Sequence, residues 1–152
     1  MKHILNIIIL LLSIGVFSQS GKVIKIKDGD TIVVLDILNN QTTIRLAEID
    51  CPESGQPFGK NAKQFTSDQV YLKWITYKVE TKDRYGRTIG KVFYDKKYLS
   101  EELVKNGLAW HYKKYSNSKN IATLEKLARQ SKKGLWSEKI STAPWDWRKI
   151  KN

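Results

Sequence analysis

Residues 23–49 read VIKIKDGDTIVVLDILNNQTTIRLAEI, and this stretch decides the fold. It holds three β-rich segments, at residues 23–27, 31–38 and 42–49. Asp28-Gly29 separates the first two, and Asp-Gly is a strong hairpin signal. Asn39-Asn40 makes the turn between the second and the third. The stretch therefore predicts a three-stranded meander.

Loop, helix and strand signals follow the meander in order. Two prolines and two glycines make residues 51–59 a loop, and residues 60–74 then have the apolar spacing of a helix. Strands are predicted over residues 75–81 and 87–94, with a turn at residues 83–86 between them. Five short strands with one helix between the third and the fourth are the layout of an OB-fold barrel.

Two later segments predict further helices. Ser100 is a good N-cap for a short helix that reaches Asn106, with Gly107 at its C-terminal end. Apolar residues at helical spacing over 121–128 predict another helix, which Gly134 ends. The expected fold class is α+β, mainly β: a five-stranded OB-fold barrel with about three helices.

The charge balance is unusual for a globular chain. The 152 residues include 27 Lys and Arg against 15 Asp and Glu, a formal net charge of +12. Such an excess creates a positive field that attracts polyanions. Nucleic acid is the first candidate partner, and anionic membranes and acidic polysaccharides are the alternatives.

Residues 1–18 have the layout of a secretory signal peptide. Lys2 and His3 form a short basic start, and an almost wholly apolar run follows from Ile4 to Phe17. This run is too short for an easy membrane span of about 20 residues. We expect cleavage after Ser18 and a secreted or periplasmic protein with no stable membrane association; an uncleaved membrane anchor is the alternative.

The remaining chain divides into a domain and a tail. We expect the domain to cover residues 19–137, and a basic and aromatic C-terminal tail to cover residues 138–152. The tail carries Trp145 and Trp147. Its sequence leaves open whether it packs against the domain.

The inventory of cysteine and histidine restricts the chemistry. Cys51 is the only cysteine, and His111 is the only histidine outside the signal peptide. An internal disulfide is therefore impossible, and zinc enzymes and histidine-based triads are nearly excluded. A metal used by this chain should be bound by oxygen.

Acidic and basic residues gather in three short stretches, at residues 28–31, 45–53 and 83–87. Carboxylates bind hard cations and arginines bind phosphate, so a site that holds both suits a phosphate ester. Taken singly, each acid has an ordinary interpretation as a turn or loop residue, and each arginine as a solvated strand residue. Together they lie at strand ends and turns, where a rigid scaffold concentrates functional side chains.

The order and spacing of these stretches resemble the staphylococcal nuclease (thermonuclease) family. The motifs that carry the resemblance are DGDT at 28–31, RL at 45–46 followed by IDCPE at 49–53, and DRYGR at 83–87. Further matches are LV at 103–104, GLA at 107–109 and GLW at 134–136. The resemblance covers roughly residues 21–137. It implies an OB-fold nuclease that uses Ca²⁺ on DNA and RNA.

The resemblance also implies a metal site. Asp30 and Asp50 supply carboxylates to Ca²⁺, and the backbone carbonyl of Cys51 is a third ligand. The thiol of Cys51 is then a small structural group rather than a nucleophile. Asp28 supports the turn or the surroundings of the metal.

Three residues take catalytic roles by the same resemblance. Arg45 and Arg87 each fork onto phosphate oxygens, and Glu53 orients or deprotonates the attacking water. A guanidinium stays protonated in water, so a water molecule is the better donor to the leaving oxygen. The resemblance implies cleavage of the 5′ P–O bond, which leaves 3′-phosphate ends.

Aromatic and basic residues are expected to bind the substrate. Tyr85 matches a family position that contacts the nucleotide, and Arg84, Lys113 and Tyr115 complete the expected set. Residues 110–115 interleave aromatic and basic side chains; the alternative is that their aromatic residues belong to the core. Stacking tolerates any base and lysines follow the backbone, so little sequence preference is expected.

We therefore expect a secreted, monomeric, Ca²⁺-dependent endonuclease that hydrolyses DNA and RNA. The alternative is a non-catalytic OB-fold module that binds nucleic acid, but such copies usually lose metal acids or arginines, and all of them are present here. A third hypothesis is a basic cell-surface module for anionic polymers. It gives no reason for acids to lie beside arginines.

Overall fold

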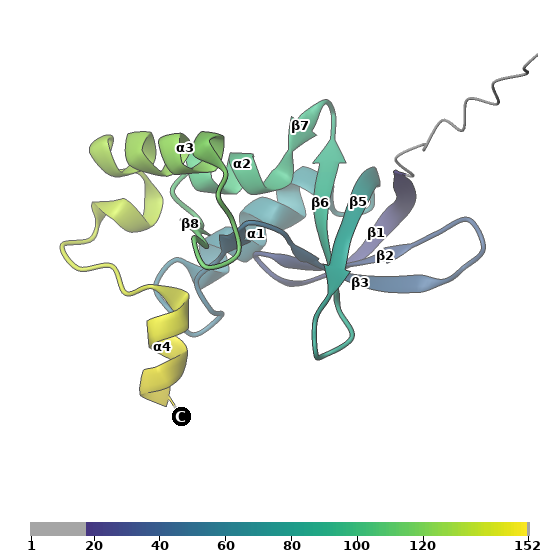
Figure 1. Cartoon of the computed structure of the whole chain (residues 1–152), viewed down its shortest axis with the longest axis horizontal. Helices are drawn as coiled ribbons and strands as arrows, with labels where there is room; N and C mark the ends of the chain where they lie inside the picture. Colours follow the sequence, from purple (N-terminus) through teal and green to yellow (C-terminus); the bar gives the residue numbers. More distant parts are fainter. Residues whose placement is uncertain (1–17, 152) are drawn as a thin grey trace, which may run out of the picture.

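The computed structural model describes residues 18–151 (Figure 1). The predicted signal peptide therefore lies outside the described residues, apart from Ser18. In the described part of the chain, no helix is long and apolar enough to cross a membrane.

Five strands form a closed barrel, which confirms the OB-fold expectation. They follow the order β3-β2-β1-β5-β6, and the barrel closes where β3 and β6 pair in parallel. The other neighbours in the barrel are antiparallel. The barrel strands are β1 (Gln19–Asp28), β2 (Thr31–Leu35), β3 (Gln41–Leu46), β5 (Trp74–Lys82) and β6 (Thr88–Tyr94).

Three shorter strands lie outside the barrel. The strand β7 (Lys97–Tyr98) pairs with the end of β6. The strands β4 (Ile49–Asp50) and β8 (Trp110–His111) pair only with each other. This small sheet holds Asp50 next to the segment that follows the second helix.

The helices gather on one side of the barrel, as Figure 1 shows. The helix α1 (Gly59–Val70) connects β4 to β5, so it falls between the third and fourth barrel strands as expected. The others are α2 (Leu99–Lys105), α3 (Lys119–Gln130) and α4 (Pro144–Lys151), with a 3-10 helix, η1 (Gly134–Ser137). The tail, whose packing the sequence left open, thus contains a fourth α-helix.

The main core fills the barrel and the space under α1 and α2. Aliphatic side chains on alternate positions of the strands point inward, because successive side chains of a strand face opposite sides of the sheet. The fully buried ones include Ile32, Val34, Ile44, Leu46 and Val92. A smaller cluster joins Ala128 of α3 to Leu135 and Trp136 of η1, and Trp110 packs against it.

The helix expected over residues 60–74 ends at Val70 instead. The backbone N–H of Leu72 donates to the carbonyl of Val23, and the N–H of Val23 donates to the carbonyl of Lys73, both at 2.9 Å. The first barrel strand thus binds the chain before another helical turn can form. Leu72, which lies within the expected helix, takes a left-handed φ of 60° and its side chain is exposed.

Two predicted strands are shorter than expected. The second ends at Leu35 because the Asp36 carboxylate accepts hydrogen bonds from the backbone N–H groups of Leu38 and Asn40, at 2.8 and 2.9 Å. The third breaks into β3 and β4, because Glu48 adopts a left-handed φ of 73° between them.

The two later helices also differ from expectation at their ends. Ser100 lies inside α2, whose N-cap is Tyr98, and its hydroxyl donates to the carbonyl of Ala47 at 2.9 Å. The long helix α3 ends at Gln130, before Gly134. Gly107 does adopt a positive φ, of 66°, directly after α2.

Candidate active site

The tight turn between β1 and β2 positions the first acid. Gly29 packs so closely that a Cβ atom there would lie 2.7 Å from the Ala62 side chain on α1 and 3.1 Å from the side chain of Cys51. Only glycine fits this approach. The turn thus packs against α1 at Ala62, and the hydroxyl of Thr31 donates to the Asp30 carboxylate at 3.2 Å. The side chain of Asp30 is nearly buried.

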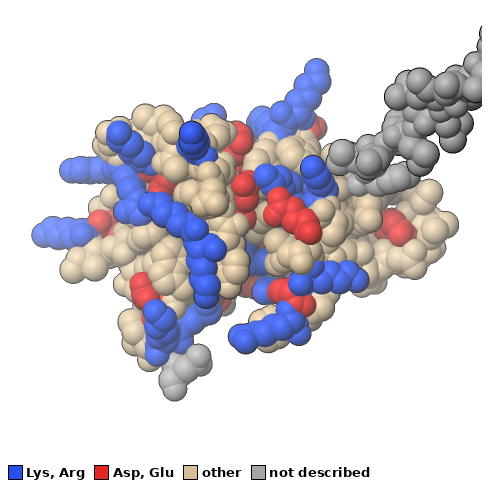
Figure 2. Space-filling model, in the orientation of Figure 1, with Lys and Arg blue, Asp and Glu red and all other residues tan. Residues whose placement is uncertain are grey.

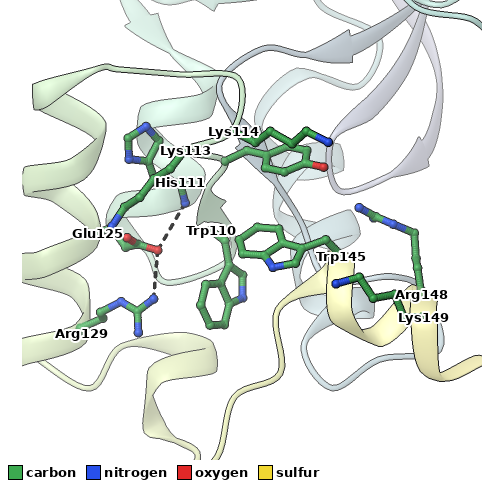
Figure 3. Close-up of a pocket in the computed structure, with 10 residues that line it drawn as sticks. Trp110, His111, Lys113, Lys114, Glu125, Arg129, Trp145, Arg148 and Lys149 are labelled. Atoms are coloured by element: carbon green, nitrogen blue, oxygen red, sulfur yellow. Dashed lines mark hydrogen bonds and ion pairs between the residues drawn. The ribbon is translucent and has the colours of Figure 1, made fainter.

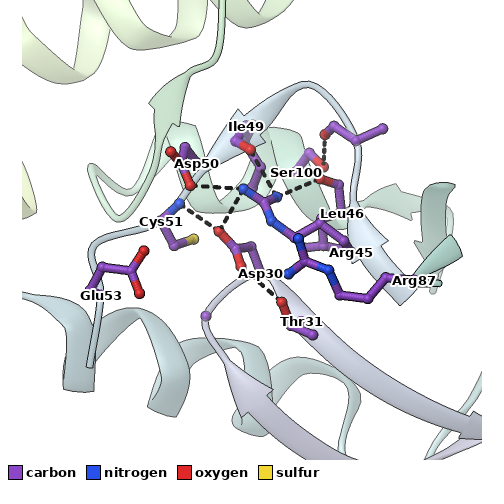
Figure 4. A network of polar contacts seen from close by, with 12 residues as sticks. Asp30, Thr31, Arg45, Leu46, Ile49, Asp50, Cys51, Glu53, Arg87 and Ser100 are labelled. Carbon is purple, nitrogen blue, oxygen red and sulfur yellow. Dashed lines mark hydrogen bonds and ion pairs between the residues drawn. The ribbon is translucent and has the colours of Figure 1, made fainter. Parts of the chain in front are cut away.

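Arg45 connects the first acid to the second (Figure 4). Its Nη2 lies 2.8 Å from Oδ1 of Asp50 and 3.2 Å from Oδ2 of Asp30. Its Nη1 donates to the backbone carbonyls of Leu46 and Ile49 at 2.7 and 2.9 Å. Burial acts to lower the pKa of Arg45, but the carboxylates of Asp30 and Asp50 outweigh it and raise that pKa, so the guanidinium stays charged.

The two acids are close enough to affect each other. Burial raises the pKa of Asp50, and the nearby carboxylate of Asp30 adds to this, while the neighbouring arginines oppose it. Burial and the charge of Asp30 also raise the pKa of Asp28. The arrangement therefore concentrates negative charge, and a bound cation would relieve the repulsion.

Cys51 contributes backbone groups to this cluster. Its N–H donates to Oδ2 of Asp30 at 2.7 Å. Burial and the charge of Asp30 raise the pKa of the Cys51 thiol well above its usual range. The thiol is thus protonated at neutral pH, and a protonated thiol is a poor nucleophile.

The donors fit a hard cation of the Ca²⁺ type better than a transition metal. Within residues 18–151, no three His, Cys, Asp or Glu side chains form a complete metal cluster. Asp30 and Asp50 nevertheless contact the same nitrogen of Arg45, and the chain continues directly from Asp50 into Cys51. Two carboxylates, a backbone carbonyl and water form an all-oxygen set of the kind that Ca²⁺ accepts.

Glu53 lies in the loop that leads from this cluster to α1. A Cβ atom at Gly59 would lie 1.9 Å from the carbonyl oxygen of Glu53, so only glycine lets the helix begin here. The N–H of Glu53 donates to the side chain of Gln56 at 3.1 Å, and the amide of Gln56 donates to the carbonyl of Thr142 at 2.6 Å. The loop is therefore tied to the C-terminal segment.

Arg148 on α4 is a site residue that the sequence reasoning missed. Its Nη1 lies 2.6 Å from Oε1 of Glu53, and its Nη2 lies 2.7 Å from Oδ2 of Asp50. Burial acts to lower the pKa of Arg148, but its bonds to Asp50 and Glu53 raise it. The signal that could have indicated a helix is Pro144 followed by two tryptophans, because proline is favoured at the first position of a helix.

Arg87 lies at the end of the turn between β5 and β6. Asp83 organises this turn: its Oδ1 accepts from the N–H groups of Tyr85 and Arg87, both at 2.9 Å, and its Oδ2 pairs with Nε of Arg87 at 2.7 Å. Hydrogen bonds from Arg87 and Tyr85 lower the pKa of Asp83 and outweigh its partial burial. The carboxylate is thus fully charged at neutral pH.

The barrel closure places Arg87 on the same side as Arg45. In the parallel pair, Thr88 lies opposite Ile44 and Ile89 lies opposite Arg45, so Arg87 and Arg45 project from neighbouring strands toward one face. In the view of Figure 4 the Arg87 side chain points toward the cluster. Among the described contacts, however, none joins Arg87 directly to Asp30 or Asp50.

The expected substrate-binding residues lie in two places. Arg84 and Tyr85 share the turn with Arg87: the guanidinium of Arg84 lies 4.9 Å from the centre of the Tyr85 ring and that of Arg87 lies 5.7 Å from it. Tyr85 is exposed. Tyr115 is exposed as well, and its ring meets that of Tyr112 edge to face at 4.8 Å.

Lys113 lines a cavity of about 520 Å³ between the segment after β8, the helix α3 and the helix α4 (Figure 3). Three aromatic residues form one wall: Trp145 stacks on Tyr112 with ring centres 5.1 Å apart and meets Trp110 edge to face at 5.6 Å. Trp110 and Tyr112 are therefore half-buried packing residues that also face this cavity.

The rest of the cavity wall is basic. Its cations are Lys113, Lys114, Arg129, Arg148 and Lys149. Among the described residues that line it, the one acid is Glu125, which already binds Arg129 at 3.2 Å and the N–H of His111 at 3.3 Å. Arg148 belongs both to this wall and to the acidic cluster, so the two places adjoin.

Basic side chains also project from the surface at many points (Figure 2). Figure 2 shows Lys and Arg over both the barrel and the helices on this face, with Asp and Glu in smaller groups between them. An anionic polymer could therefore approach over a wide area.

Comparison with known proteins bears on this geometry. The model of the family described as staphylococcal nuclease homologue matches residues 43–138, a segment that includes Arg45, Asp50, Glu53 and Arg87. The chain belongs to the staphylococcal nuclease family. Asp30 and the whole of α4 lie outside the matched segment of this family of phosphodiester hydrolases.

Relatives in the staphylococcal nuclease family occur in bacteria and plants. An uncharacterized endonuclease of Haemophilus influenzae is 41% identical over 128 residues, 84% of this chain and 72% of that protein. Micrococcal nuclease of Shigella flexneri is 37% identical over 155 residues, 93% of this chain and 88% of that protein. A staphylococcal-like nuclease of Arabidopsis thaliana is 40% identical over 116 residues, and the match spans only 36% of its length.

Proposed function

We propose that this chain is a Ca²⁺-dependent endonuclease that hydrolyses phosphodiester bonds of DNA and RNA with little sequence preference. The observation that carries the proposal is the nearly buried bridge in which Arg45 binds both Asp30 and Asp50. A buried pair of acids held together by one arginine is costly for a purely structural site. It suits a site that assembles opposite charges around a phosphate.

The oxygens of Asp30, Asp50 and the Cys51 carbonyl are the proposed ligands of the cation. Ca²⁺ held by these oxygens would supply positive charge that stabilises the negative charge of the phosphate in the transition state. The fixed hydrogen bonds of Asp30 and Asp50 hold these carboxylates in place before any ligand arrives.

Two arginines and one acid supply the protein's own chemistry. Arg87 meets Asp83 through Nε, which leaves its terminal nitrogens for two phosphate oxygens. Arg45 adds a fixed positive charge beneath the same face. Such contacts accelerate the reaction to the extent that they strengthen as phosphorus becomes five-coordinate.

Glu53 is the proposed water-handling residue. Its side chain is 38% exposed, so solvent reaches it, and it lies next to Asp50 through their shared partner Arg148. From this position Glu53 orients or deprotonates the attacking water. The leaving 5′ oxygen then takes its proton from water, because the guanidinium groups keep theirs. The family resemblance supports 3′-phosphate products.

The substrate strand is proposed to run from the acids into the basic cavity. The exposed Tyr85 and Tyr115 offer ring faces for bases, and Lys113 offers charge for the backbone. Stacking and charge together bind single strands without reading the sequence.

A cleavage assay tests the function. Purified protein should degrade single-stranded DNA and RNA with Ca²⁺ and stop when EGTA removes the ion, and end-group labelling should find 3′-phosphates. Equal degradation in EGTA would remove the metal from the mechanism. Tight binding without any cleavage would favour the non-catalytic module instead.

Export is a separate proposal, and it rests on the amino-acid sequence of residues 1–18. Mass spectrometry of the protein from the medium or periplasm should find a chain that begins at Gln19. Recovery of the uncut chain with the membrane fraction would instead support the anchor.

A further inference from the structure

The helix α4 reaches back across the molecule to the acids of the site. Arg148 on α4 and its partner Asp50 are 98 residues apart in sequence. The Arg148 guanidinium spans two acids at once, with Nη1 on Glu53 at 2.6 Å and Nη2 on Asp50 at 2.7 Å. Such a contact, with one terminal nitrogen on each acid, uses the planar guanidinium of arginine. The single ammonium group of lysine cannot reproduce this geometry.

Glu53 needs such a partner. It lies in a loop with its side chain 38% exposed, and three rotatable bonds separate its carboxylate from the backbone. In the part of the chain that the structure describes, the Glu53 carboxylate has no hydrogen-bond partner except Arg148. Without Arg148 this carboxylate would sample several rotamers, and its ordering would cost free energy in each catalytic cycle.

The helix α4 is itself held firmly enough to place Arg148. Trp145 stacks on Tyr112 at 5.1 Å with the two rings only 7° from parallel. Just before the helix, the carbonyl of Thr142 accepts the amide of Gln56 at 2.6 Å, and Gln56 belongs to the same loop as Glu53. Arg148 and Glu53 are thus anchored to one another through both the side chains and the backbone.

We propose that Arg148 is a positioning residue of the active site, which holds the Glu53 carboxylate beside Asp50 for its work on the attacking water. The inference rests on the proposed nuclease function. It assigns to α4 a part in the reaction rather than only in packing. A merely structural ion pair would stabilise α4 and leave the geometry of Glu53 unimportant.

A double-mutant cycle separates these roles. We expect Arg148→Met to lower kcat on single-stranded DNA roughly ten- to a hundredfold at saturating Ca²⁺, the scale of a small misplacement of a catalytic group. KM should change less than about threefold. In a Glu53→Gln background, Arg148→Met should lower kcat by no more than about twofold, because a residue that acts through Glu53 has nothing left to position.

Conservative variants and added reagents sharpen the test. Arg148→Lys keeps the charge and should still lose most of the activity, and added guanidinium should partly restore Arg148→Ala but not the double variant with Glu53→Gln. Asp146→Asn is the matched control on the same helix, where it removes only the exposed ion pair with Lys149. It should leave kcat unchanged. Circular dichroism and tryptophan fluorescence report whether each variant keeps α4 in place.

Each outcome decides something. A wild-type kcat in folded Arg148→Met would overturn the positioning role and leave the nuclease function intact. So would a double variant whose fold-loss of kcat equals the product of the losses in the two single variants. If Arg148→Met fails to fold, the same comparison is made with Arg148→Lys, where full activity would overturn it. If the wild-type protein does not cleave DNA with Ca²⁺, both the nuclease function and this inference are overturned. This outcome is measured on the wild-type protein alone, so it is distinct from a failure of the positioning role.

Discussion

At the scale of the residue, Arg45 holds the site together. Its two terminal nitrogens contact four partners, which are two carboxylates and two backbone carbonyls. Its side chain is only 11% exposed. Removing one partner of a buried charge network lowers the free energy of unfolding strongly, because the remaining charges stay buried without a compensating charge. Replacing the whole network by apolar residues costs far less.

Arg45→Met should therefore destabilise the fold. Asp30 and Asp50 would then face each other without their shared cation, and a loss of about 3–5 kcal/mol is expected in urea unfolding with EGTA present. Added Ca²⁺ should recover part of this loss, because a cation between the carboxylates replaces the missing charge. Lys73→Met, which breaks an exposed pair with Asp95, is the control and should stay within about 1 kcal/mol of wild type. Equal stability of Arg45→Met and wild type would contradict the buried network.

Arg87 makes a sharper test of catalysis than of stability. Arg87→Lys keeps the positive charge but loses the fork that meets two phosphate oxygens, so kcat should fall at least about a hundredfold. Circular dichroism should show an intact fold, because the Arg87 side chain is 34% exposed. Lys82→Arg, another exchange of one cation for another near the same turn, should keep wild-type kcat. A wild-type rate in Arg87→Lys would remove the fork from the mechanism.

At the scale of the element, the loop of residues 51–58 and the helix α1 are fitted closely together. The first residue of α1, Gly59, lies against the backbone of Glu53, and Gln56 closes the loop between them. The helix start thus sets where the loop can run. The loop that carries Glu53, the proposed water-handling residue, is thus held between β4 and α1.

Gly59→Ala should disturb both stability and activity. The new methyl group would need space that the Glu53 carbonyl occupies, and overpacking of this kind typically costs about 1–3 kcal/mol. Because the loop must shift, kcat should fall with it. The thermal midpoint and kcat of Asn61→Ala, on the exposed face of the same helix, provide the control and should stay near wild type. An unchanged midpoint in Gly59→Ala would show that the loop yields without strain.

The cavity between α3 and α4 predicts a contact with the strand away from the bond that is cut. Lys113→Gln should raise KM for long single-stranded DNA roughly tenfold, the scale of one lost charge-assisted contact, and leave kcat unchanged. A dinucleotide too short to reach the cavity should be cleaved equally by both proteins. Lys97→Gln, on β7 and outside the cavity, is the charge-matched control. Equal KM values for long DNA would exclude the cavity from the strand path.

At the scale of the whole molecule, the net charge of +12 affects the binding of the nucleic acid rather than the cleavage of its phosphodiester bond. Lysines and arginines displace counterions from a nucleic acid, so binding weakens steeply with salt. For about three phosphate contacts, KM for long single-stranded DNA should rise roughly tenfold or more between about 50 and 200 mM salt. The kcat at saturating DNA should change little. A KM that does not respond to salt would argue against charge as the source of affinity.

The amino-acid sequence predicted the barrel because its signals are local. Alternation of apolar residues, Asp28-Gly29 and the prolines of the loop each act over a few neighbouring residues, and together they leave few arrangements other than an OB-fold. The errors fell at element ends, as at Leu72, where a tertiary hydrogen bond to Val23 overrides helical spacing.

The same sequence indicated which charged residues belong together but not how they meet. Asp30, Arg45 and Asp50 were expected to share a site on the order and spacing of their motifs, and the structure joins them through one guanidinium. Arg87 lies near them because β3 and β6 close the barrel in parallel. That pairing joins strands that are distant along the chain, so no short motif specifies it.

Arg148 marks the limit of reading the sequence alone. The sequence by itself determined the barrel, the basic character and the acids and arginines of the motifs, because each is written in local spacing or composition. Only the tertiary structure decided that the tail folds into α4 and that its arginine bridges Asp50 and Glu53. The physical reason is that α4 is held against the domain by the stacking of Trp145 on Tyr112. A contact between residues 98 positions apart produces no periodic pattern in the sequence.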